Sequence, residues 1–240
     1  VFNAMNERKI LLIGFSWTAG TDPEEVTNCY RPAPAEYLDT NLYKIYNAGV
    51  AGSPIHLHNF LLEGLLTSIK PDHVFFQITH PQRYSCQISD TPLEDILKLA
   101  WREEKPNYFN FWLEDVIKKH FHIVTISNYN DKGKNQTAVQ QAHSKHFKNI
   151  VSTDLLLSEF YSALTYAKNL LKDVSHTFIA SNLESSEQPL SEYKSLLGEK
   201  VYVPDVCIPK YDKYLVDKGH HLNPKGAELY CKKIYEPNLD

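Results

Sequence analysis

The chain has 240 residues, of which 42% are hydrophobic and 22% are charged, proportions that are typical of a globular protein able to bury its own core. Its formal net charge of −4 gives no basic footprint for nucleic acid, and no stretch approaches the roughly 20 apolar residues of a membrane-spanning helix. The first residues lack the apolar core of a signal peptide. The cysteines are far apart and fit no disulfide framework, which predicts free thiols in a reducing, cytoplasmic compartment. They are Cys29, Cys86, Cys207 and Cys231.

The first third of the sequence predicts strands that alternate with a helix. Residues 9–14 form a short apolar run that ends at Gly14, as is typical of a strand buried on both faces. Residues 42–46 and 73–77 are two further candidate strands, and residues 58–69 between them carry apolar side chains at helical spacing. This order favours a parallel sheet with helices on its faces.

The middle of the sequence is less regular. Residues 92–101 and 111–119 have helical patterns, with an interruption at Pro106, and residues 123–126 could form a strand. No repeat, linker or domain boundary is visible. We therefore expect one domain, residues 1–240, with an elaborated middle region around residues 85–150.

The C-terminal part returns to the alternating pattern. A long helix is predicted over residues 154–171 with Asp154 as its cap. Short strands are expected at residues 177–180 and 201–203, and a final helix from about residue 222 to 235.

Ser16 is the first candidate for chemistry, because it lies just beyond the first predicted strand. Ligands of open parallel sheets bind beyond the carboxyl ends of the strands, where a serine could present its hydroxyl to a cleft. A helix cap or an ordinary loop serine is the alternative. The spacing does not fit the G-x-S-x-G elbow of α/β-hydrolases, since Thr18 stands where that motif needs glycine.

Two further segments follow the second and third strands. The turn Asn47-Ala48-Gly49-Val50-Ala51-Gly52-Ser53 could direct a backbone N–H at a developing oxyanion, although a plain turn explains it nearly as well. The segment Gln77-Ile78-Thr79-His80 places polar groups at the same edge of the sheet.

The run from Asp217 to Gly226 is the strongest local feature, because a carboxylate near an imidazole can fix the tautomer of a general base. The adjacent His220 and His221 could also be part of a metal site. Adjacent side chains diverge, however, and no acid or cysteine stands at a familiar zinc spacing. We expect neither a metal nor a cofactor here or at the other paired histidines. Those pairs are His56/His58, His120/His122 and His143/His146.

Together these four segments resemble, in the right order, the four sequence blocks of the SGNH/GDSL hydrolase superfamily. The resemblance implies a three-layer α/β/α fold with a central parallel sheet of about five strands, similar to flavodoxin. It implies Ser16 as nucleophile and the N–H groups of Ser16 and Gly52 as oxyanion donors. Thr79 stands where the family has an asparagine that donates to the oxyanion, so it is a possible third donor with a shorter reach.

The resemblance leaves the base open between two neighbours. Asp217 and His220 satisfy the family's Asp-x-x-His spacing, but the residues after His221 better match its passage into the last helix. We favour His221 as the base and Asp217 as the residue that orients it, with His220 as the alternative.

Three functions remain in order of preference. The first is an esterase that hydrolyses a small acyl ester, with O-acetyl groups on carbohydrates as a class on which relatives act. The second is an acyltransferase that uses the same serine to modify a sugar hydroxyl. The third is a non-catalytic domain that binds a glycan or a protein, for which the substitution at Thr79 is the argument. A flavodoxin-like nucleotide binder ranks last, because no glycine-rich phosphate loop follows the first strand.

Overall fold

The computed structural model describes most of the chain, with gaps. The described residues are 7–20, 32–81, 83–99, 101–111, 119–125, 138–150, 152–180, 190–198, 201–202, 214–216 and 221–239.

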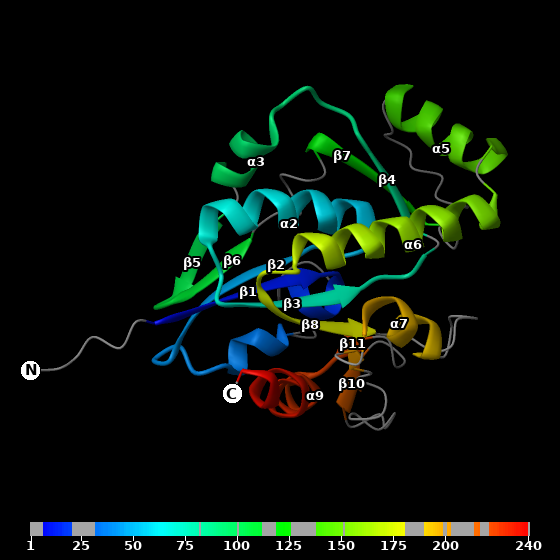
Figure 1. Ribbon diagram of the computed structural model, residues 1–240. Helices are drawn as coiled ribbons and strands as arrows, with labels where there is room; N and C mark the ends of the chain where they lie inside the picture. Colours follow the sequence, from blue (N-terminus) through cyan, green and yellow to red (C-terminus); the bar gives the residue numbers. More distant parts are fainter. Residues whose placement is uncertain are drawn as a thin grey trace, which may run out of the picture.

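A seven-stranded sheet forms the centre of the structure, in the order β5-β6-β2-β1-β3-β8-β9 (Figure 1). The strands are β1 Arg8–Gly14, β2 Tyr43–Gly49, β3 His73–Ile78, β5 Trp101–Lys105, β6 Tyr108–Phe111, β8 Ser175–Ala180 and β9 Val201–Tyr202. Every neighbouring pair is parallel except β5 and β6, which form an antiparallel pair at one edge. The predicted fold class is confirmed, and the sheet is wider than the five strands expected.

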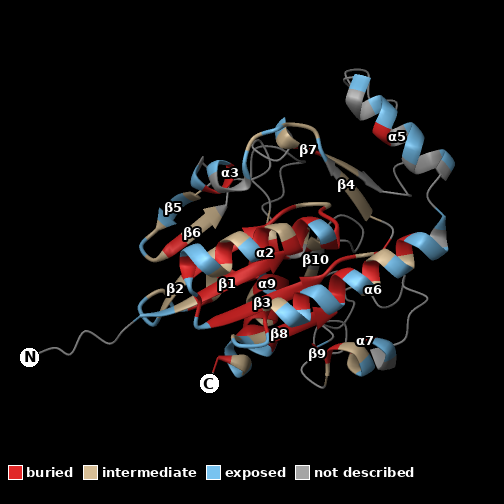
Figure 2. Ribbon diagram, turned by 45° about the horizontal axis from the view of Figure 1, so that its top comes forward, coloured by how far each residue is buried: buried red, intermediate tan, exposed pale blue. Residues whose placement is uncertain are grey.

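Helices cover both faces of this sheet and make it the middle of three layers (Figure 1). The first face carries α2 Ile55–Ile69, α3 Leu93–Leu99, α6 Thr153–Leu170 and α7 Leu190–Leu197. The other face carries the 3-10 turn η1 Pro34–Tyr37, α9 Pro224–Tyr230, and its continuations η5 Cys231–Tyr235 and η6 Glu236–Asn238. The central strands β1, β3 and β8 are buried along most of their length, whereas the edge strand β5 is largely exposed (Figure 2).

The apolar run of β1 explains how one strand contributes to both cores. Alternate side chains of a strand point to opposite faces of the sheet. Accordingly, Leu11 and Ile13 pack with the residues of α2 and α6, whereas Ile10 and Leu12 pack with those of η1, α9 and η5. All four side chains are fully buried, which stabilises each by roughly 1.5–3 kcal/mol relative to exposure.

Between β3 and α6 the chain leaves the regular alternation. The strands β4 Arg83–Gln87 and β7 Phe121–Thr125 form a separate antiparallel pair, and α5 Ala138–Ile150 follows them. In Figure 1 this pair lies on the side of α2 and α6. The predicted strand at residues 123–126 falls on β7, and β4 and α5 were not anticipated.

The first predicted helix, residues 92–101, falls on α3, although its last residue Trp101 begins β5. The interruption at Pro106 is the turn of a hairpin of β5 and β6, which uses a left-handed φ of 63° at Asn107. Residues 112–118 of the second pattern lie outside the described residues. Asp154 is not the cap of α6, because the Ser152 side chain accepts a hydrogen bond from the N–H of Leu155 at 3.2 Å, as an N-cap serine does.

The remaining predicted elements agree with the structure to within a few residues. In the part of the chain that is described, no helix is both long and apolar enough to cross a membrane.

Candidate active site

The strand order brings three of the predicted site residues to one edge of the sheet. The order β2-β1-β3-β8 has its switch point between β1 and β3, where ligands bind in flavodoxin-like folds. Ser16 follows β1, Gly52 follows β2 and Thr79 follows β3. Because these strands are parallel, all three residues lie beyond the same carboxyl edge.

Ser16 opens the short helix α1 Ser16–Ala19, which lies tightly against β2. A Cβ atom built on Gly49 would stand 2.3 Å from the Ala19 nitrogen, so only glycine lets the two backbones approach this closely. The Asn47 side chain adds a hydrogen bond from Nδ2 to the Thr18 carbonyl at 2.8 Å. Gly49 and Asn47 therefore fix the position of α1 against β2. Ser16 is partly exposed.

The turn that carries Gly52 is fixed by its neighbour Ser53. Gly52 has a φ of 73° and open space around a Cβ position, so the backbone conformation explains this glycine. The buried Ser53 hydroxyl lies 2.7 Å from the Val50 carbonyl and 2.6 Å from His58 Nε2. These hydrogen bonds connect the turn at Gly52 and Ser53 to the first turn of α2.

Thr79 is buried and bonded on both sides of its hydroxyl. Oγ1 donates to the Ser53 carbonyl at 2.8 Å and accepts from Nη1 of Arg83 at 2.9 Å. A hydroxyl has a single proton, so Thr79 can donate to an oxyanion only by giving up its bond to Ser53. In this conformation the hydrogen bond from Thr79 stabilises the turn at Gly52 and Ser53.

The C-terminal segment reaches the site through a small ribbon. The strands β10 Leu215–Val216 and β11 His221–Leu222 pair antiparallel, with Val216 opposite His221. β11 contacts α1, the helix that Ser16 opens. His221 is partly exposed, whereas Leu222 is buried in the core. Asp217 and His220 lie outside the described residues.

The residues after His221 start α9 in the manner expected from the sequence. Asn223 is the N-cap, and its side chain accepts a hydrogen bond from the Gly226 N–H at 3.0 Å. Pro224 follows in the first turn, and the Asn223 N–H donates to the Tyr214 carbonyl at 3.0 Å. These bonds fix the backbone immediately after His221.

Sequence reasoning missed Arg83 and the role of His58. Arg83 contacts Thr79 and lies over the ring of Phe15, with its Cζ 4.8 Å from the ring centroid. Phe15 is distant from Arg83 in sequence, so no local pattern signals this contact. His58 was considered only as half of a possible metal pair.

The described members of the histidine pairs have other partners. His58 Nε2 is hydrogen-bonded to the Ser53 hydroxyl, and the Nδ1 atoms of His122 and His143 lie 2.9 Å apart. Within the described part of the chain, no three of the histidine, cysteine, aspartate and glutamate side chains are placed to hold a metal ion.

His58 should make the fold sensitive to acid. Burial, and secondarily the charge of Arg83, lower its pKa to about 3. Its Nδ1 is buried with no partner among the described residues, so a proton there would lack an acceptor. Below a pH of about 6.5 the unfolded chain binds this proton and the folded chain does not. The free energy of unfolding should therefore fall as pH drops from about 6.5 towards 3, by about 3 kcal/mol near pH 4 from this group.

Urea unfolding across this pH range measures the effect. The His58→Gln variant, which can keep a polar atom near Ser53, should show a shallower fall than the parent. The exposed His146→Gln variant should keep the parent slope. Equal slopes for the parent and His58→Gln would contradict a neutral, buried His58.

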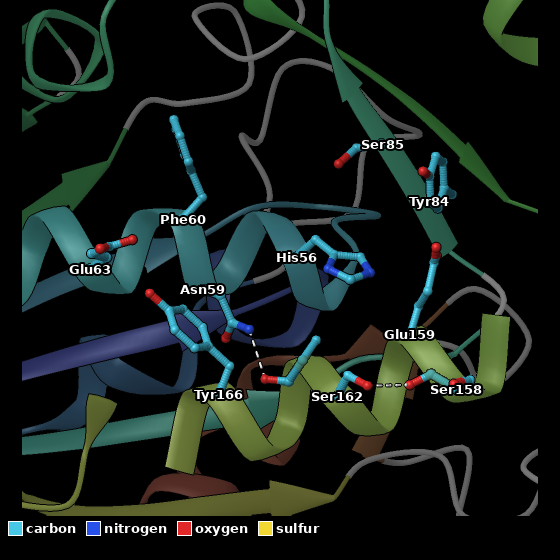
Figure 3. A pocket seen from close by; sticks show the side chains of 11 residues that line it. His56, Asn59, Phe60, Glu63, Tyr84, Ser85, Ser158, Glu159, Ser162 and Tyr166 are labelled. Atoms are coloured by element: carbon cyan, nitrogen blue, oxygen red, sulfur yellow. Dashed lines mark hydrogen bonds between the residues drawn. The ribbon is translucent and has the colours of Figure 1, made fainter. Parts of the chain in front are cut away.

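A cavity of about 550 Å³ lies elsewhere, along the outer surfaces of α2 and α6 beside β4 (Figure 3). It contains none of the predicted catalytic residues. It is lined by His56, Asn59, Phe60, Glu63, Tyr84, Ser85, Ser158, Glu159, Ser162, Ala163 and Tyr166.

Comparison with known proteins gives only distant similarities. No model of a protein family matches the sequence, and no curated protein matches it. Among solved structures, the chain is similar to a lipase/acylhydrolase from Enterococcus faecalis, with 17% identity, coverage of 95% of this chain and 93% of that one, and a TM-score of 0.43. It is also similar to a GDSL-like lipase from Bacteroides thetaiotaomicron, with 9% identity, coverage of 97% and 88%, and a TM-score of 0.47.

A third similar structure is an acetylxylan esterase from Geobacillus stearothermophilus, with 13% identity, coverage of 96% and 94%, and a TM-score of 0.47.

Proposed function

We propose that this protein is a serine-dependent ester hydrolase of the SGNH type. One observation supports the proposal most strongly. The residues that follow β1, β2 and β3 in three of the sequence blocks lie beyond the same carboxyl edge of the sheet. The strand β11, which carries His221, contacts α1, which begins at Ser16. A nucleophile, a base and backbone donors within one edge are the parts that acyl transfer through a serine requires.

In the proposed reaction, the Ser16 hydroxyl attacks the ester carbonyl while His221 takes its proton. The carbonyl oxygen becomes an oxyanion, and the N–H groups of Ser16 and Gly52 donate to it. The carbon–oxygen bond to the alcohol breaks as His221 returns the proton to the leaving oxygen. Water then releases the acyl group by the same steps, with Asp217 orienting the imidazole.

The substrate class is a small acyl ester, and an O-acetyl group on a carbohydrate is the class that the family resemblance implies. No metal or cofactor enters the proposed reaction.

The wide separation of the cysteines in the sequence supports a reducing, cytoplasmic compartment. Cys231 is a buried free thiol, and burial raises its pKa to about 12.

Labelling with a fluorophosphonate probe tests the proposal, because this reagent reacts with activated serines. We expect the parent protein to be labelled and the Ser16→Ala variant to remain unlabelled. Ser68→Ala is a matched control, since Ser68 is an exposed serine on α2, and it should be labelled like the parent.

Two outcomes would contradict the proposal. Labelling that survives in Ser16→Ala would place the nucleophile elsewhere. A folded parent that is never labelled would favour a non-catalytic binding domain. If labelling depends on Ser16, product analysis with an acceptor sugar present separates hydrolysis from acyl transfer.

A further inference from the structure

Arg83 is a cationic side chain at the candidate active site that the four sequence blocks do not include. It opens β4, just beyond β3, and its N–H donates to the His80 carbonyl at 3.3 Å. The partly buried side chain turns towards the carboxyl edge of β1 and β3. There it donates to Thr79 Oγ1 at 2.9 Å and lies 4.8 Å from the centroid of the Phe15 ring.

Most N–H groups of the Arg83 guanidinium have no acceptor among the described residues. A guanidinium carries five N–H groups, and among the described residues this one donates a single side-chain hydrogen bond, to Thr79. No carboxylate of the described chain forms an ion pair with it. Burial lowers the pKa of Arg83 to about 10, which reflects the cost of holding the charge away from water. A charge held in this way is stabilised when an anion meets it.

The contacts of Arg83 connect it to the segments that carry the two predicted backbone donors. Phe15, under the guanidinium, immediately precedes Ser16. Thr79, its hydrogen-bond partner, donates to the carbonyl of Ser53, which immediately follows Gly52. The cation therefore contacts the neighbour of Ser16 directly and is linked to the neighbour of Gly52 through Thr79, so an anion at this edge would form close to it.

Thr79 cannot fill the same role without loss. Its single proton is engaged with Ser53, and its oxygen accepts from Arg83. The residue at the position where the family has asparagine thus orients the guanidinium instead of donating to a ligand.

We propose that Arg83 donates to the oxyanion that forms when Ser16 attacks an ester, and that Thr79 positions it. As the bond between Ser16 Oγ and the carbonyl carbon forms, one electron pair of the C=O bond moves to oxygen and the Oγ proton moves to His221. An N–H of Arg83 then bonds to that oxygen until the electron pair returns and the alcohol leaves. This inference rests on the proposed function, since it requires Ser16 to form an acyl intermediate.

Hydrolysis of para-nitrophenyl acetate, an ester without charge, tests the inference. The Arg83→Gln variant should lose about 10²–10³-fold in kcat, as the loss of one oxyanion donor does, with KM within about threefold of the parent. Arg83→Lys, which keeps the charge, should recover part of the loss. Arg102→Gln is the control, because Arg102 is an exposed arginine on β5, and its kcat should equal that of the parent.

A second ester that carries a carboxylate, para-nitrophenyl hemisuccinate, separates the two sources of negative charge. If Arg83→Gln raises KM for this ester alone and leaves kcat for the acetate unchanged, Arg83 binds a fixed charge on the substrate and the proposal is overturned. Unchanged kinetics on both esters overturn it as well. Thermal unfolding of each variant shows whether a loss of kcat comes from a loss of fold.

The failure of this inference differs from that of the proposed function. If the parent neither hydrolyses esters nor reacts with the fluorophosphonate probe, the serine mechanism fails and the Arg83 proposal fails with it. If the parent is active and Arg83→Gln is equally active, only the role of Arg83 fails.

Discussion

Replacing His221 with alanine is expected to lower kcat for ester hydrolysis by about 10⁴-fold or more, because the serine hydroxyl then loses the base that takes its proton. The described backbone fixes the position of His221, the base in the proposed reaction. Its strand contacts α1, it pairs with Val216, and the bonds of Asn223 fix the chain directly after it. A base whose backbone is fixed in this way would keep a constant distance to the nucleophile.

His220→Ala is the matched control, and its kcat should change by less than about tenfold. Steady-state kinetics on para-nitrophenyl acetate measure both variants, and circular dichroism confirms that each is folded. A larger loss in His220→Ala than in His221→Ala would assign the base to His220, as the Asp-x-x-His spacing of the family suggests.

Gly49→Ala is expected to destabilise the fold by about 3 kcal/mol and to lower kcat by about 10²-fold. The added Cβ would stand 2.3 Å from the nitrogen and 2.6 Å from the Cα of Ala19, and neither backbone atom can rotate away. Overpacking of this kind typically costs about 1–3 kcal/mol. The helix that Ser16 opens must move, and a displacement of about 1 Å at a reacting group can cost about 10²-fold in rate.

Gly198→Ala provides the comparison, because Gly198 also lacks a side chain but has open space around its Cβ position. Its φ of 96° should cost roughly 1 kcal/mol and leave kcat unchanged. Thermal unfolding and the rate of fluorophosphonate labelling measure the two effects. A Gly49→Ala protein with the parent's stability and labelling rate would show that α1 is not held by this contact.

The sequence predicts those parts of the fold that depend on local patterns. The apolar run of β1 and the helical spacing of α2 each arise from residues close together in the chain, so periodicity identifies them. The hairpin of β5 and β6 escapes this reasoning, because its alternation is short and β6 is stabilised by pairing with β2, far away in sequence.

Only part of the candidate site could be predicted from the sequence. Ser16, Gly52 and His221 lie in segments that resemble the sequence blocks of the family, and the resemblance implies their roles. The bonds of Thr79 could not be predicted, since they join β3 to Ser53 and to Arg83 through tertiary packing. His58 behaves similarly. Nothing in its local sequence indicates that its ring is buried against a serine hydroxyl.

The position of β1 also bears on how the chain assembles during synthesis. β1 precedes β2 and β3 in the sequence but lies between them in the sheet, so it stays without one neighbour until Ile78 has been made. At roughly 5–20 residues per second, that interval lasts several seconds. During this time the five residues Ile10 to Gly14 carry no charge and are mostly apolar, a composition that favours aggregation. Arg8 and Lys9, which directly precede it, fit the role of charged gatekeepers that discourage neighbouring nascent chains from pairing with it.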